Sequence, residues 1–145
     1  MHHIMYMSTA AVVVGENELK QMLVYYRGNN QQHDITGLLL YSGEHYVQLI
    51  EGKEADLRML FTKIVKDYHH IDIIKLADGK ISQRMFSDWS MGFKVVSEEL
   101  FSTLSGYVNP YGHDFLHSLP EHNEDSPVEV LRQFAKRNLA DISYR

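Results

Sequence analysis

The pattern of hydrophobic and polar positions predicts three β-strands in the N-terminal third of the chain. Residues 3–8 are a short apolar run, residues 35–41 are apolar almost throughout, and residues 44–52 alternate between apolar and polar side chains. Ser42 and Gly43 separate the last two runs, and a short loop that contains glycine is typical of a β-hairpin. We therefore predict one strand followed by a hairpin, with strand 35–41 near the centre of the sheet.

Strand 44–52 carries a polar side chain in the middle of an apolar face. Tyr46, Gln48 and Ile50 share that face, because side chains alternate from one side of a strand to the other. A buried amide without a partner costs about 1–3 kcal/mol. Gln48 therefore needs a hydrogen-bonding partner.

Two segments have the periodicity of amphipathic helices, residues 16–28 and residues 54–68. Gly28 is expected to end the first of them, because glycine commonly terminates helices. Hydrophobic side chains recur at intervals of three and four positions, which places them on one side of each helix. These stripes are Leu19, Met22, Leu23 and Tyr26 in the first helix, and Leu57, Leu60, Phe61, Ile64 and Tyr68 in the second.

Two further strands complete the predicted core domain. Residues 71–82 are read as a strand that is interrupted or turned at Asp78-Gly79, and residues 89–96 as a fifth strand. The order of elements is β-α-β-β-α-β-β. Two helices in this order fit a sheet covered on one face, which predicts the α+β class with a ferredoxin-like arrangement.

The character of the sequence changes after residue 96. Residues 97–108 have a helical register, and a second helix is predicted from Pro127, with Ser126 as N-cap and Glu129 completing a capping box. Its apolar stripe is Val128, Leu131, Ala135 and Leu139. We therefore predict a domain of residues 1–96 and a two-helix extension of residues 97–145. The extension could cover the exposed face of the sheet or contact another subunit.

Composition and charge argue against several classes of function. The chain has 145 residues, 44% hydrophobic and 23% charged, and this balance is ordinary for a globular protein. It shows no long apolar run and no signal peptide, so a cytoplasmic location without membrane contact is expected. The net charge is −5, and the sequence shows no stripe of basic residues, so nucleic acid is not an expected partner. There is no cysteine, and the nine histidines lack metal-ligand spacing, so we predict no metal site.

Four features suggest chemistry, although each one is weak alone. Asn29 and Asn30 follow the first helix, Tyr6 and Gln48 lie in the middle of strands, and Trp89 is the only tryptophan. An asparagine pair after a helix is usually a cap or a turn. Buried tyrosine and tryptophan side chains usually belong to the core. Only the combination, in this order and spacing, is informative.

The combination resembles the BLUF domain, a photoreceptor module for "blue light using flavin". The resemblance covers residues 2–96 in the order found in the family, and it is greatest for a short, stand-alone member. The matching stretches are "YMS", "NNQQHDITGLLLY", "VQLIEG", "IVKDYHH" and "RMFSDWSMGF". The fold of that family is the ferredoxin-like one expected from the order of the elements.

The resemblance implies flavin adenine dinucleotide (FAD), held without a covalent bond between the two helices. By position, Tyr6 and Gln48 would be the photoactive pair, with Gln48 bridging the flavin and the Tyr6 hydroxyl group. The implied cofactor-binding residues are Asn29 and Asn30 at the ring edge, Met22, Tyr26, Ile35 and Ile64 around the ring, and Lys63, Asp67 and His70 toward the ribose and phosphates. Tyr26 departs from the family, in which a small hydroxyl residue is common there. It could reshape the pocket or act as a second electron donor.

The resemblance also implies a mechanism and a kind of partner. Light would drive electron and proton transfer from Tyr6, followed by a rearrangement of the Gln48 hydrogen bonds. Trp89 or Met91 would carry the signal into the fifth strand, and the sequence leaves open which of them packs near the flavin. The expected output is an unidentified downstream signalling protein, reached through the C-terminal helices of a homo-oligomer.

Two other classes of function compete with a light sensor. One is an interaction module of the same fold without a cofactor. The other is a small enzyme that uses Glu51 and Glu54, but acids at a strand-to-helix turn simply favour a helix N-terminus. The sequence shows no nucleophile-base pair and no phosphate-binding loop, so catalysis is not expected.

Overall fold

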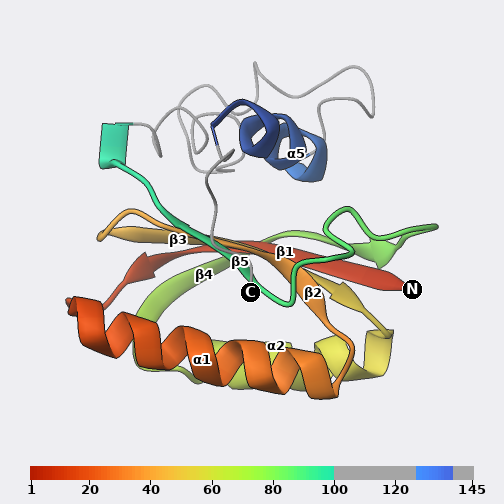
Figure 1. Ribbon diagram of the computed structural model, residues 1–145, viewed down its shortest axis with the longest axis horizontal. Helices are drawn as coiled ribbons and strands as arrows, with labels where there is room; N and C mark the ends of the chain where they lie inside the picture. The colour runs from red at the N-terminus through yellow and green to blue at the C-terminus, as the bar shows by residue number, and fades with distance from the viewer. Residues whose placement is uncertain (100–126, 139–145) are drawn as a thin grey trace.

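The computed structural model describes residues 1–99 and 127–138 (Figure 1). The strands are β1 (His2–Ala10), β2 (Thr36–Tyr41), β3 (His45–Gly52), β4 (His70–Lys80) and β5 (Gly92–Val95). The helices are α1 (Glu16–Gln32), α2 (Glu54–Val65) and α5 (Pro127–Asn138). Residues 100–108 of the predicted first helix of the extension, the Ser126 cap and Leu139 lie outside the described residues.

The strands form one sheet in the order β4-β1-β3-β2-β5. Neighbouring strands are antiparallel, except that β5 runs parallel to β2. Helices α1 and α2 cover one face, and α5 lies over the other (Figure 1). This arrangement confirms the predicted ferredoxin-like α+β fold, including the hairpin. Gly43 has a φ of 92°, a conformation that glycine adopts easily in such a turn.

Two hydrophobic clusters lie on opposite faces of the sheet. The helix-covered cluster contains Ile4, Tyr46 and Ile50, whereas the neighbouring residues Val47 and Leu49 belong to the other cluster. The strand alternation read from the sequence is therefore confirmed.

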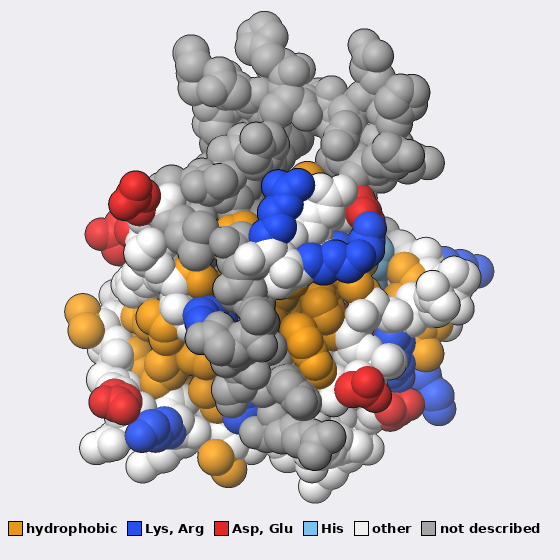
Figure 2. All heavy atoms as spheres, turned by 45° about the horizontal axis from the view of Figure 1, so that its top comes forward, with side chains coloured by type: hydrophobic (Ala, Val, Ile, Leu, Met, Phe, Trp, Pro, Cys, Tyr) orange, Lys and Arg blue, Asp and Glu red, His pale blue; other side chains and the backbone are white. Residues whose placement is uncertain are grey.

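Helix α5 packs its apolar side onto the second face of the sheet. Val128, Leu131, Phe134 and Ala135 are buried there, and three of these belong to the predicted stripe. Seen from this side, hydrophobic side chains also remain visible beside the grey residues (Figure 2). No helix among the described residues is long and apolar enough to cross a membrane.

The predicted boundaries of β4 and α2 differ from the observed ones. Strand β4 continues through Asp78-Gly79, because these residues pair with β1 and because the Asp78 carboxylate binds His2, Arg58 and Lys75. Helix α2 ends at Val65, so Tyr68 lies beyond it with 70% of its surface exposed.

Candidate functional site

A pocket of about 250 Å³ lies between α1, α2 and the sheet face that they cover. Its lining comes from both helices, from the four strands β1 to β4 and from the connection after α2. The predicted site residues among the lining are Tyr6, Met22, Tyr26, Asn29, Asn30, Gln48, Lys63, Ile64, Asp67 and His70. Ile35 is different: it is buried in the helix-covered cluster and lines a smaller neighbouring pocket.

Tyr6 and Gln48 form the floor of the pocket. They lie opposite each other on β1 and β3, and the Tyr6 hydroxyl group donates a hydrogen bond to Gln48 Oε1. Tyr6 is 3% exposed and Gln48 is 6% exposed. Burial raises the pKa of Tyr6 well above its ordinary value, and the nearby Tyr26 and Asp67 raise it further. Tyr6 is therefore a neutral phenol that holds its proton toward Gln48.

The amide nitrogen of Gln48 has spare hydrogen-bonding capacity. Its Nε2 donates to Met91 Sδ at 3.5 Å, and a thioether sulfur is only a weak acceptor. An amide nitrogen carries two N–H groups, and the second has no partner among the described residues. Gln48 can therefore donate a hydrogen bond to a ligand in the pocket while it accepts one from Tyr6.

Trp89 and Met91 lie on opposite sides of the sheet. Met91 belongs to the helix-covered cluster, whereas Trp89 packs against the α5-side cluster and stacks on Phe86 with ring centres 4.8 Å apart. The Trp89 ring also fills the space where a side chain on Gly92 would lie. A regular strand would place residues two apart on the same face, but β5 begins only at Gly92. The residue that reaches the pocket amide is thus Met91.

The asparagine pair belongs to the last turns of α1. Gly28 does not end this helix, because its backbone stays helical and the helix continues to Gln32. Asn30 is 1% exposed, and its Nδ2 donates to Ser90 O at 2.7 Å. The Asn29 side chain lines the pocket without a hydrogen bond to any described residue.

A chain of hydrogen bonds joins α1 to the connection that follows α2. The Tyr26 hydroxyl group donates to Asp67 Oδ2 at 3.3 Å, and Asp67 Oδ1 also accepts from the His69 backbone N–H at 2.9 Å. Burial alone would raise the pKa of Asp67, but the backbone and side-chain hydrogen bonds from His69 hold that pKa below its ordinary value. The His69 ring in turn contacts Glu18 on α1. The bulky Tyr26 phenol therefore bridges the two sides of the pocket.

Lys63 and His70 differ in what they can offer to an anion. Both ring nitrogens of His70 are engaged, Nε2 with Ile64 O at 2.6 Å and Nδ1 with Ser8 Oγ at 2.7 Å. Lys63 lines the pocket and makes no ion pair with any described residue. Lys63 is thus the cation available for a phosphate, whereas His70 orders the pocket wall.

Several lining residues were not singled out from the sequence. The sequence pattern placed Leu19 and Leu60 only in the apolar stripes of the two helices, and it placed Tyr46 only on the apolar face of its strand. The Tyr46 hydroxyl group is buried and makes no hydrogen bond among the described residues. Tyr25, Leu39 and His69 also line the pocket. Leu39 and His69 lie within two of the stretches that match the family, whereas no pattern in the sequence distinguishes Tyr25.

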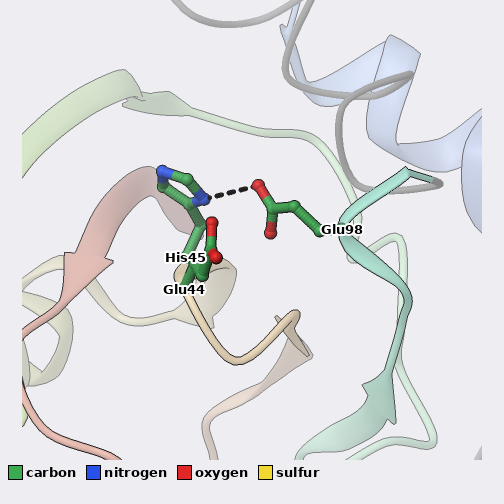
Figure 3. Close-up of side chains that lie close together, drawn as sticks. All are labelled: Glu44, His45 and Glu98. Atoms are coloured by element: carbon green, nitrogen blue, oxygen red, sulfur yellow. Dashed lines mark hydrogen bonds and ion pairs between the residues drawn. The ribbon is translucent and has the colours of Figure 1, made fainter.

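A group of potential metal ligands lies elsewhere, at the start of β3. The ligand atoms of Glu44, His45 and Glu98 lie within 4.8 Å of one another (Figure 3). His45 Nδ1 is 2.9 Å from Glu98 Oε1, and Glu44 is exposed. A hydrogen bond between β3 and the segment after β5 is sufficient to explain this group.

The fold and the pocket define a ferredoxin-like domain with a pocket between two helices and a sheet, lined by apolar side chains and by the amides of Asn29 and Gln48. Residues 1–92 match the model of the BLUF family, described as sensors of blue light using FAD. The chain therefore belongs to the BLUF family.

Individual relatives are consistent with this assignment. The chain is 44% identical over 62 residues to the photoactivated adenylate cyclase subunit alpha of Euglena gracilis. The matched region is 43% of this chain and 6% of that protein. It is 32% identical over 74 residues to the blue light- and temperature-regulated antirepressor BluF of Escherichia coli. That match covers 51% of this chain and 18% of the antirepressor. The chain spans less than a fifth of the length of these relatives. The dark-state structure of the BLUF protein BlrB superposes with a TM-score of 0.69 at 29% identity, covering 95% of this chain and 96% of BlrB.

Proposed function

We propose that this chain senses blue light through FAD held non-covalently in the pocket, with Tyr6 and Gln48 as the photoactive pair. The observation that carries the proposal is their buried hydrogen bond at the pocket floor, which leaves one N–H of Gln48 for a ligand. The direct test is the light-minus-dark absorption spectrum of the protein loaded with FAD.

The lining suits a flavin. Met22 and Ile64 offer apolar walls from the two helices, and the amides of Asn29 and Gln48 offer hydrogen bonds to a ring edge. Lys63 offers a positive charge for phosphate. This charge favours FAD or another phosphorylated flavin over riboflavin.

The residues of the floor can perform the switching chemistry. When bound, the flavin supplies absorption of blue light and an excited state that accepts an electron. Tyr6 would provide the electron, and its phenolic proton would leave along the existing hydrogen bond to Gln48 Oε1. Return of the electron and of a proton from Gln48 to Tyr6 would restore the phenol, so the lasting change would be in the hydrogen bonds of Gln48. Gln48 has a donor end and an acceptor end, so rotation or tautomerisation rewires its hydrogen bonds without creating a charge.

The proposed output passes through Met91 into β5 and toward the C-terminal residues. Gln48 contacts Met91, and β5 follows directly from that residue. The named relatives are a photoactivated adenylate cyclase subunit and a blue light- and temperature-regulated antirepressor, which supports a role in light sensing that is coupled to an output. We propose that this chain is a non-enzymatic sensor that acts on a partner protein, as a homo-oligomer.

Replacing Asn30 with alanine should weaken FAD binding. The change removes a ring-edge hydrogen bond and also leaves Ser90 O unpaired, so the dissociation constant should rise about tenfold. Fluorescence titration of FAD measures it, with Gln31→Ala, an exposed neighbour on α1, as the control. A dissociation constant within about twofold of the wild-type value would remove Asn30 from the site.

Replacing Tyr26 with phenylalanine should speed the release of FAD. The variant keeps the ring but loses the hydrogen bond to Asp67 that joins the two sides of the pocket, so the dissociation rate should rise about fivefold. Stopped-flow displacement measures this rate, and Tyr25→Phe, which removes a more exposed hydroxyl group, is the control. An unchanged rate would show that the Tyr26–Asp67 bond does not retain the cofactor.

A further inference from the structure

Glu51 is a buried carboxylate on the face of the sheet opposite the pocket. It lies in β3, three residues after Gln48, and is 1% exposed. The sequence suggested an acid that merely favours the N-terminus of α2. Instead, its side chain accepts hydrogen bonds from the backbone N–H groups of Met85 and of Phe86, the latter at 2.9 Å.

These two backbone groups lie near the start of segment 84–91, which leads from Glu51 to the pocket. The segment contains no helix or strand, so its position depends on side-chain packing and on individual hydrogen bonds, including one from the Gly37 N–H to Trp89 O at 2.9 Å. Within it, the Trp89 N–H donates to Phe86 O at 3.1 Å. At its far end, Ser90 O accepts from Asn30 and Met91 Sδ accepts from Gln48.

Arg84 also holds the start of this segment against β2 and β3. Its guanidinium group donates to Thr36 Oγ1 at 2.9 Å, to Glu51 O at 3.2 Å and to Asp34 O at 2.6 Å. Burial raises the pKa of Glu51, and the Met85 and Phe86 N–H groups and Arg84 act against that rise. A buried carboxylate is costly unless its hydrogen bonds are satisfied. The neighbours of Glu51 on this face, Val47 and Leu49, are apolar, so ordinary packing does not call for an acid here.

We propose that Glu51 is a positioning residue for the light switch: it fixes segment 84–91 so that Ser90 O and Met91 Sδ meet the amides of Asn30 and Gln48. The switching part of this inference rests on the proposed function. The anchoring part concerns only the chain itself and can be measured without light.

The first test is fluorine NMR of protein labelled with fluorotryptophan, which gives one signal because Trp89 is the only tryptophan. Glu51→Gln keeps one acceptor oxygen but turns an NH2 group toward a backbone N–H. The Trp89 signal should shift or broaden in Glu51→Gln and stay unchanged in Glu54→Gln, a matched change of an exposed acid on α2. An unchanged signal in Glu51→Gln would overturn the anchoring role.

The second test is the thermal recovery of the light-induced state in FAD-loaded protein. Recovery should be about fivefold faster or more in Glu51→Gln, because a loosely held segment rearranges over a lower barrier, and FAD affinity should stay within about twofold. A normal recovery rate together with a shifted Trp89 signal would make Glu51 a structural anchor only.

Arg84→Lys provides the same two readouts if Glu51→Gln does not fold. It keeps the charge but loses the forked hydrogen bonds, and it should change both readouts in the same direction. Absence of a light-induced state in the wild-type protein would overturn the proposed function and the switching role together, whereas the NMR result on Trp89 would still decide the anchoring role.

Discussion

Tyr6→Phe is expected to bind FAD normally and to lose the light-induced red shift of flavin absorption. Phenylalanine fills nearly the same volume, so the floor of the pocket keeps its shape. It is, however, a poor electron donor and has no proton to pass to Gln48 Oε1. The amplitude of the light-minus-dark difference should fall about twentyfold or more.

Tyr46→Phe is the matched control for this variant. Tyr46 lines the same pocket, and its hydroxyl group has no hydrogen-bonding partner among the described residues. This variant should keep the red shift. A full and reversible shift in Tyr6→Phe would contradict the assignment of Tyr6 and would direct attention to Tyr26 as the electron donor.

Gln48→Leu is expected to fold, bind FAD and absorb blue light without forming a persistent shifted state. Leucine has similar bulk but neither end of the amide, so it can neither accept from Tyr6 nor donate to a ligand. The buried Tyr6 hydroxyl group loses its partner, which should lower the free energy of unfolding by about 1–3 kcal/mol. Thermal denaturation measures that loss, and difference spectroscopy measures the photochemistry.

Gln31→Leu serves as the control because it makes the same substitution at an exposed position of α1 that does not line the pocket. It should leave the spectrum and the stability nearly unchanged. If Gln48→Leu formed a shifted state with normal thermal recovery, the amide of Gln48 would be only a packing group.

Strand alternation predicted the floor of the site correctly. It placed Gln48 on an apolar face and required a partner, and the partner present in the chain is Tyr6. This prediction succeeded because the period of a strand is fixed by its backbone and does not depend on distant contacts.

Local preferences failed where distant contacts determine the structure. Gly28 is a common helix terminator, yet α1 continues for another turn to bring Asn30 to Ser90 O. Glu51 has the sequence position of an acid near a helix start, but its partners lie more than 30 residues away. Trp89 and Met91 separate because the chain reaches β5 only after both of them.

The light-minus-dark absorption spectrum of the wild-type protein loaded with FAD tests the central claim most directly. We predict a yellow protein whose flavin absorption shifts reversibly to longer wavelength under blue light and returns in the dark. Protein that folds but retains no flavin after incubation with FAD, or that binds it without any light-induced shift, would contradict the account.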